Sequence, residues 1–252
     1  MIWDQLTSPD IGALDRNIPV ILPIAATEQH GPHLPVATDR MIGQHFAHGV
    51  HQADPNRVLI LPPAAVGCSE HHMDFAGTLT LSHGCFNHQV QEILKSVIHH
   101  GFHHLILLNS HGGNQGIGQV IIEELGFRNP GVELVLISWW RLANKALLEI
   151  NESGPGGVGH AGEFETSLMM LIAPDLVKLD SIENGRNQQG FSWAQGDLLR
   201  GSQAAHYQTM KQLTPNGIYG DPRSATVEKG KQITEAVVAE LLAVVNDLSK
   251  QS

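Results

Sequence analysis

Short apolar runs alternate with helix-like stretches along this chain. The apolar runs cover residues 18–25, 57–62, 104–109 and 132–138. Continuous apolar runs of this length are typical of strands that are buried on both faces of a sheet. The helix-like stretches lie between and after these runs, at residues 39–52, 82–100, 115–127, 163–172 and 224–247.

This alternation predicts an α/β fold with a mostly parallel sheet and helices on both of its faces. Right-handed crossover connections would place the carboxyl ends of the strands along one edge of the sheet. Residues 184–222 are rich in Gly, Gln, Asn and Ser, and we expect a long loop region there that lines the site or an oligomer contact. No repeat or linker interrupts the chain, so we expect residues 1–252 to form a single domain.

Composition narrows the function classes. Hydrophobic residues make up 42% of the chain, so it can bury a large core and is too apolar to be disordered. The net charge is −10 with no basic block, which disfavours nucleic-acid binding. No apolar run approaches the ~20 residues of a membrane helix, and the first residues do not resemble a signal peptide. With only Cys68 and Cys85 there is no disulfide framework, and we expect a cytoplasmic protein.

Histidine is the unusual component. The 16 histidines outnumber the 15 lysines and arginines together, which points to metal or proton chemistry. Histidines, acids and glycines gather at residues 27–39, 109–114 and 159–166. The first two of these segments follow predicted strands directly, where ligands bind in α/β sheets. We expect all three segments to converge on one edge of the sheet.

The first segment offers a mixed set of metal ligands. Glu28 and His30 are two residues apart, so in extended backbone they point to the same face. Asp39 follows a Gly-Pro turn at the start of the next predicted helix. Carboxylate and imidazole together suit Zn²⁺, Mn²⁺ or Fe²⁺. The alternative for this segment alone is a solvated Glu28, a loop histidine, and an Asp39 that is favoured by the helix dipole.

The other two segments add further candidates. His111 lies just beyond a very apolar predicted strand, and Gly112 would allow the backbone to approach a ligand closely. Glu163 and Glu165 are two residues apart at the start of a predicted helix, so they do not share a face and only one should reach a metal. We expect Glu163, which is nearer the loop, to be that ligand, with Glu165 supporting it or binding substrate. Together the segments offer ligands for two metals, with Asp39 able to bridge them.

These motifs resemble those of the creatininase (creatinine amidohydrolase) family. The first is PIAxxEQHGPHLP at residues 23–35, followed by Asp39. GxS at residues 67–69 precedes His71 or His72, and FxGT follows at residues 75–78. NxHGGN at residues 109–114 and GHAGExETS at residues 159–167 complete the match, which spans about residues 1–245 in the family's order.

The resemblance implies a three-layer α/β/α domain, usually assembled as a hexamer, with two divalent metal ions, zinc paired with zinc, manganese or iron. By resemblance, Glu28, Asp39 and His111 would hold one ion, and His30, Asp39 and Glu163 the other. A hydroxide between the metals would attack the amide carbon.

His160 matches the family histidine that moves a proton to the leaving nitrogen, a role that imidazole suits near neutral pH. The chain departs from creatininase itself at two places. Creatininase has a metal-binding glutamate where this chain has Gly113, and Glu163 looks like the replacement. It also has a tryptophan and an acid in the stretch that Gly156 and Gly157 occupy here, so creatinine is disfavoured as the substrate. Other members resemble formamidopyrimidine deformylases or peptide-trimming hydrolases.

We therefore expect a metal-dependent amidohydrolase that cleaves a C–N bond, other than a peptide bond, in a small cyclic amide or formamide. Its partners would be this small molecule and further copies of the chain. Substrate-binding candidates are Ser69, Thr78, Gly112 and Glu165, although Ser69 and Thr78 could equally cap turns. The alternative is a non-catalytic metal-binding or assembly protein, which would predict the loss of a ligand or of His160. All of them are present.

Overall fold

The centre of the structure is a four-stranded parallel sheet. The computed structural model describes residues 1–185, 187–188 and 190–250. The strands stand in the order β2-β1-β3-β4, and each neighbouring pair is parallel. They are β1 (Val20–Ile24), β2 (Leu59–Ile60), β3 (His104–Asn109) and β4 (Glu133–Ser138).

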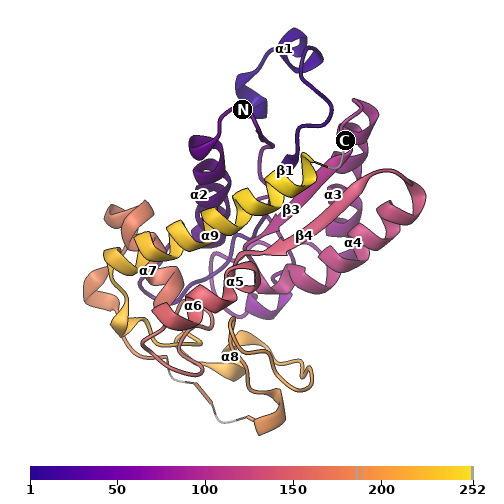
Figure 1. The fold of residues 1–252 in the computed structure, drawn as a ribbon. Helices are drawn as coiled ribbons and strands as arrows, with labels where there is room; N and C mark the ends of the chain where they lie inside the picture. The colour runs from indigo at the N-terminus through magenta and orange to yellow at the C-terminus, as the bar shows by residue number, and fades with distance from the viewer. Residues whose placement is uncertain (186, 189, 251–252) are drawn as a thin grey trace.

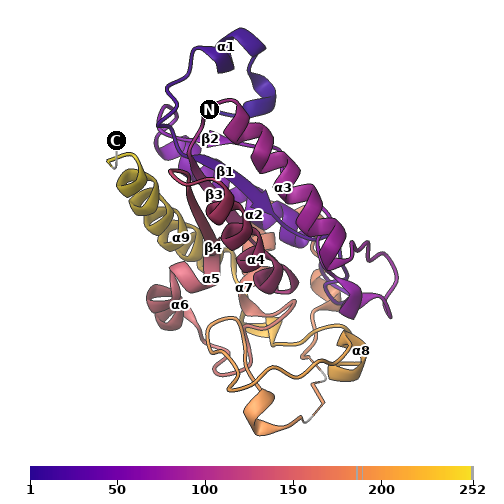
Figure 2. The same cartoon turned by 90° about the vertical axis from the view of Figure 1, so that its right-hand side faces the viewer.

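Helices cover both faces of the sheet. On one face lie α3 (His83–His99) and α4 (Gln115–Arg128), and on the other lie α2 (Thr38–Ala53), α7 (Glu163–Ile172) and α9 (Val227–Leu248) (Figure 1, Figure 2). Four short helices were not expected from the sequence: α1 (Ser8–Gly12), α5 (Trp139–Leu142), α6 (Asn144–Ile150) and α8 (Met210–Leu213). The three-layer α/β/α prediction is confirmed.

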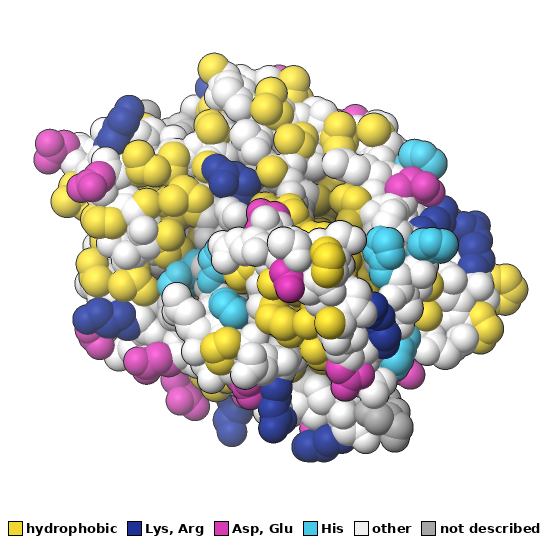
Figure 3. Space-filling model, turned by 90° about the horizontal axis from the view of Figure 1, so that it is seen from above, with side chains coloured by type: hydrophobic (Ala, Val, Ile, Leu, Met, Phe, Trp, Pro, Cys, Tyr) yellow, Lys and Arg dark blue, Asp and Glu magenta, His cyan; other side chains and the backbone are white. Residues whose placement is uncertain are grey.

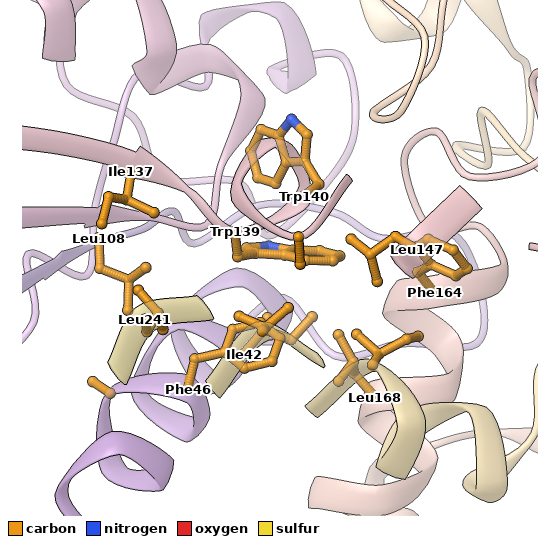
Figure 4. Close-up of a cluster of buried hydrophobic side chains, with 14 of the residues drawn as sticks. Ile42, Phe46, Leu108, Ile137, Trp139, Trp140, Leu147, Phe164, Leu168 and Leu241 are labelled. Atoms are coloured by element: carbon orange, nitrogen blue, oxygen red, sulfur yellow. The ribbon is translucent and has the colours of Figure 1, made fainter. Parts of the chain in front are cut away.

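Two apolar clusters hold the layers together. Ile21 of β1 packs into the cluster formed with α2, α7 and α9, whereas Leu22 faces the cluster formed with α3 and α4. This alternation is the period-2 geometry of a strand. Figure 4 shows the first cluster, in which side chains of α2, β3, α7 and α9 meet around Trp139. Each fully buried side chain of this size contributes roughly 1.5–3 kcal/mol, so the helices that carry polar residues to the sheet edge are firmly placed.

Trp139 and Trp140 follow β4 and point to different places. Both belong to the apolar cluster, in which the ring of Trp139 lies among the other side chains and that of Trp140 lies at the margin (Figure 4). The two ring centroids are 5.5 Å apart and the planes are perpendicular. Trp140 lines the cavity beside the histidines and acids described below. Trp139 therefore belongs to the core, and Trp140 belongs both to the core and to a pocket wall.

The strand order creates a switch point between β1 and β3. The chain passes from β1 to β2 on one side and then to β3 on the other side of β1. A crevice forms at such a point beyond the carboxyl ends of the strands. The segments after Ile24 and Asn109, which end β1 and β3, therefore emerge side by side.

Residues 184–222, of which 186 and 189 lie outside the described residues, run below the carboxyl edge of the sheet (Figure 1, Figure 2). Leu198 and Met210 from this region line the cavity at that edge. The loop region therefore helps to form the site, one of the two roles expected for it.

Two surface properties accompany this fold. No helix in the described part of the chain has the length and hydropathy needed to span a membrane. On the face shown in Figure 3, basic side chains lie in several separate places among acidic ones, in keeping with a sequence without a basic block.

Candidate metal centre

A buried group of acids and histidines lies at the switch point. Glu28 follows β1, Asp39 lies in the first turn of α2, and His111 follows β3. His111 Nδ1 is 3.3 Å from Glu28 Oε1 and 3.2 Å from Asp39 Oδ2. All three residues are buried, and their ligand atoms lie within 4.8 Å of one another. This group is the first of the two metal sets expected from the sequence, brought together in space.

A second group adjoins the first through Asp39. His30 Nε2 is 3.2 Å from Asp39 Oδ1 and 3.7 Å from Glu165 Oε2. Asp39 thus directs one carboxylate oxygen toward His111 and the other toward His30. His160 completes a set of possible ligands with His30 and Glu165, and another with Glu28 and His72.

The atoms at the centre of these groups lack hydrogen-bond partners. Both carboxylate oxygens of Glu28, Oδ2 of Asp39 and Nε2 of His30 are buried without one. An unpaired polar atom in the interior costs about 1–3 kcal/mol or more, so native proteins rarely leave several together. Carboxylate oxygens and imidazole nitrogens converging in this way fit divalent cations, which would satisfy all of these atoms at once.

Main-chain carbonyls fix the orientation of three of the histidine rings. His30 Nδ1 lies 3.1 Å from Glu28 O, His111 Nε2 lies 3.0 Å from Cys68 O, and His160 Nε2 lies 2.7 Å from Gln29 O. A carbonyl only accepts, so in each ring this nitrogen carries the proton and donates. The other nitrogen then faces the acids, and its lone pair can bind a metal ion that takes the place of a proton there. Metal-binding histidines use this arrangement to fix their tautomer.

His72 is held the other way round by Gln29. Gln29 Nε2 lies 3.0 Å from His72 Nδ1 and 3.2 Å from Gly217 O. The amide nitrogen donates, so His72 Nδ1 accepts and its proton lies on Nε2, 3.4 Å from Glu28 Oε1. His72 therefore points an N–H, rather than a lone pair, at Glu28. Neither Gln29 nor His72 was assigned a role from the sequence. Gln29 lies in the EQH string of residues 28–30, and His72 lies in the EHH string of residues 70–72.

Burial and charge act on the pKa of each group. Burial lowers the pKa of His30, but Asp39, Glu165 and Glu28 outweigh it and raise that pKa to about 10. Burial lowers the pKa of His72 to about 3 despite the nearby Glu28, and it lowers the pKa of His160 well below its ordinary value. The surrounding acids thus favour a positive charge at His30, while His72 and His160 are neutral.

Glu165, not Glu163, faces this centre, and this corrects the expectation for the two acids. The Glu163 carboxylate accepts from Lys229 Nζ at 2.6 Å, from Asn151 Nδ2 at 2.9 Å and from the N–H of Ser153 at 2.9 Å. These donors hold the Glu163 carboxylate on the side of α7 that faces α9. Of the two acids, Glu165 lies beside His30 and Glu163 lies beside Lys229, which is the reverse of the expected arrangement.

Backbone geometry explains why the acid comes from α7. A Cβ atom at Gly113 would lie 2.2 Å from Cys68 O and 2.5 Å from His111 Nε2, so no side chain fits there. Ala161 has φ = 52°, a left-handed conformation that costs a non-glycine residue energy. Its N–H donates to Glu165 Oε2 at 2.6 Å. The strained turn thereby connects His160 to Glu165 and holds the carboxylate toward His30.

The four substrate-binding candidates divide into two pairs. Gly112 and Glu165 line a cavity of about 160 Å³ above the cluster. Ser69 and Thr78 do not line it: Ser69 Oγ is 3.4 Å from His111 Nε2, and Thr78 Oγ1 accepts from the N–H of Gln29. Ser69 thus contacts a histidine, and Thr78 holds the main chain of Gln29.

Together, an α/β/α sheet and a buried carboxylate–imidazole centre at its switch point define a metallohydrolase-like architecture. The family model described as "Creatininase: Creatinine amidohydrolase" matches residues 4–245. The chain therefore belongs to the creatininase family and is an amidohydrolase of that family.

Similar proteins differ in their named activities. A "mycofactocin precursor peptide peptidase" of Mycobacterium ulcerans is 31% identical over 89% of this chain and 83% of its own. The "creatinine amidohydrolase" of Pseudomonas putida is 29% identical over 65% of this chain and 67% of its own. The "3-dehydro-scyllo-inosose hydrolase" of Thermotoga maritima is 24% identical over 92% and 78%.

Solved structures support the fold. A putative creatinine amidohydrolase from Bacteroides fragilis has a TM-score of 0.82 at 22% identity and covers 100% of this chain and 97% of its own. A structure described as "Creatininase Mn" has a TM-score of 0.79 at 23% identity, covering 98% and 97%. Other creatininase structures are described as a Zn-Zn type and as a complex with creatine.

Proposed function

We propose that this chain binds two divalent metal ions and uses them to hydrolyse the C–N bond of a small amide. The observation that carries this proposal is the set of buried ligand atoms without partners on Glu28, His30 and Asp39. Glu28 and Asp39 line a cavity of about 160 Å³, and His30 lies directly behind Asp39. A non-catalytic assembly protein would have no reason to retain such an energetically costly arrangement.

Two ligand sets follow from the contacts. Glu28, Asp39 and His111 would hold one ion, and His30, Asp39 and Glu165 the other, with Asp39 shared. Zinc, manganese and iron suit these donors. Manganese and zinc appear in the descriptions of creatininase structures.

The bound metals and two histidines would have different roles in the reaction. Bound divalent ions would lower the pKa of a water molecule and polarise the amide carbonyl. His160 is neutral, with its Nε2 proton held by Gln29 O, so Nδ1 is free to take a proton and pass it to the leaving nitrogen. Against the effect of burial, the pKa of Glu28 is lowered by His111 and, to a smaller extent, by His72, whose Nε2 lies 3.4 Å from Glu28 Oε1.

Three features bear on the substrate and the assembly. Gly157 packs against Ser153, where a Cβ would lie 2.0 Å from its Oγ, so the side chains of the creatininase pocket have no counterpart there. This favours an amide other than creatinine, including a formamide or another small amide. The peptidase relative extends the range to short peptides. The family motifs further support a homo-hexamer, which sedimentation velocity tests, and the presence of only two cysteines supports a cytoplasmic location.

Elemental analysis of the purified, unchelated protein tests this function first. We expect about two ions of zinc, manganese or iron per chain, together with hydrolysis of at least one compound in a panel of formamides, cyclic amides and acylated amines. A protein that takes up no metal on reconstitution would refute the proposal. A protein with two metals but no amidase activity would refute the catalytic part of it alone.

A further inference from the structure

The metal cavity adjoins a second, larger cavity. Trp140, His160 and Leu198 line both of them. The second cavity has a volume of about 710 Å³, against about 160 Å³ for the first. Its outer wall is built largely by the loop region of residues 184–222. A substrate at the metal centre therefore has room to extend past His160 into this space.

Arg141 supplies an uncompensated positive charge to the second cavity. It is an exposed residue of α5, directly after Trp140, and it lines the cavity wall. Within the described residues, no ion pair or side-chain hydrogen bond engages its guanidinium group. An arginine that faces a cavity without a partner is suited to an anionic ligand, because its planar fork of N–H donors matches a carboxylate.

Asp197, the one acid among the described residues that line this wall, does not neutralise Arg141. The Asp197 side chain is 1% exposed, and it accepts from the N–H groups of Gly156 and Arg200 as well as from the Arg200 guanidinium. Its carboxylate is thus already engaged by these donors. The Oε1 atom of Gln115, on the same wall, is buried without a hydrogen-bond partner. The second cavity thus combines a free cation with an unsatisfied acceptor.

The position of His160 indicates which half of the substrate enters this cavity. His160 lines both cavities and, under the proposed function, gives its proton to the leaving nitrogen. The amine half must then lie on the His160 side and extend toward Arg141. The acyl half stays at the metal centre.

We infer that Arg141 binds a carboxylate on the amine half of the substrate, so that the substrate is an N-acylated amino acid or a short peptide with a free carboxyl end. Water adds to the amide carbon, the C–N bond breaks, and the nitrogen takes up a proton. The products are an acyl carboxylate and a free amino acid or shortened peptide. The inference rests on the proposed function, but its test does not require turnover.

Binding of matched pairs tests this inference. The N-acetyl derivatives of glycine, L-leucine and L-tyrosine are compared with their carboxamides, which differ only in lacking the negative charge. Binding to the metal-loaded protein is measured by ligand-observed NMR, which also reports any release of acetate. The variants are Arg141→Gln and Arg141→Lys. Arg128→Gln, which removes an exposed arginine at the end of α4, is the matched control.

We expect at least one acid to bind wild-type protein and Arg128→Gln about tenfold more tightly than its amide, which corresponds to ~1.4 kcal/mol. Arg141→Gln should abolish this preference, and Arg141→Lys should retain only part of it because it lacks the fork. The absence of a preference in every pair, or its persistence in Arg141→Gln, would overturn the inference. An Arg141-dependent preference without acetate release would support the inference and count against catalysis of these amides.

Discussion

Lys229 Nζ lies 2.6 Å from Glu163 Oε1, so a buried ion pair joins the first turn of α9 to the first turn of α7. Lys229 also contacts the exposed Glu152 at 2.9 Å. The pair holds the Glu163 carboxylate on the side of α7 that faces α9, and Glu165, two residues on, faces His30. A contact between helices far apart in the sequence thereby sets the chemistry of the site.

Glu163→Gln should destabilise the protein and leave its metal content unchanged. The substitution leaves the buried Lys229 without its main counter-charge, and breaking a buried pair typically costs about 3–5 kcal/mol. Urea unfolding measures the loss, and elemental analysis should still find two metals per chain.

Glu165→Gln is the matched substitution with the opposite expected result. It removes a carboxylate next to His30, so the metal content should fall to about one ion per chain. After the metals have been removed with a chelator, the variant and the wild-type protein should unfold at similar urea concentrations. Loss of metal from Glu163→Gln, with full retention in Glu165→Gln, would reverse our assignment of the two acids.

Asp39→Ala should abolish binding of both metals. Its two carboxylate oxygens face different histidines, so one substitution removes a ligand from each set. Metal content after reconstitution and gel filtration checks this. Two metals per chain in the folded variant would show that Asp39 does not bridge them.

His160→Ala should retain most of the metal and lose most of the turnover. A general acid or base typically contributes about 10²–10⁴-fold to rate, and kcat should fall within that range. Loss of metal together with activity would contradict this prediction. It has to be measured because His160 Nδ1 lies 3.5 Å from Glu28 Oε1. That result would make His160 a metal ligand instead.

Substitutions at Ala161 should separate backbone strain from side-chain size. Ala161→Gly removes the left-handed penalty of roughly 1–2 kcal/mol but adds chain entropy of roughly 0.5–1 kcal/mol, so stability should change little. Ala161→Val places a β-branched residue in the same buried turn and should lower both stability and metal affinity. Equal urea midpoints for the two variants would mean that the strain is absent.

Chelation should lower stability, and added metal should restore it. Ions that bind only the folded chain stabilise it by about 2.7 kcal/mol when free metal is a hundred times its Kd. Thermal unfolding of EDTA-treated protein, titrated with zinc or manganese, measures this. A midpoint that does not depend on metal would contradict binding at the buried ligand atoms.

The local pattern of the sequence predicted most of the framework. Residues 104–109 and 163–172 are the bounds of β3 and α7, because long apolar runs and helical periodicity are local properties. The run at residues 57–62 yields only Leu59–Ile60 as a strand, since β2 lies at the sheet edge and prolines follow at residues 62 and 63. Short helices such as α5 carry too little periodicity to be predicted.

The site was predicted as a set of residues but not in its detail. The motifs identified Glu28, Asp39 and His111, and strand ends at one edge explain why they meet. The choice between Glu163 and Glu165 depended on Lys229, 66 residues away, and no local rule contains that contact. Arg141 was not singled out because its significance comes from a cavity that only the folded loop region completes.

The carbonyl oxygens that aim His30, His111 and His160 belong to Glu28, Cys68 and Gln29. A carbonyl is common to every amino acid, so replacing the side chain of Cys68 or Gln29 leaves the acceptor in place. Point mutation can therefore delete a histidine, yet it can hardly misalign one without moving the main chain. Genes of this kind can diverge widely in their loops and substrate pockets while the reactive centre stays aligned.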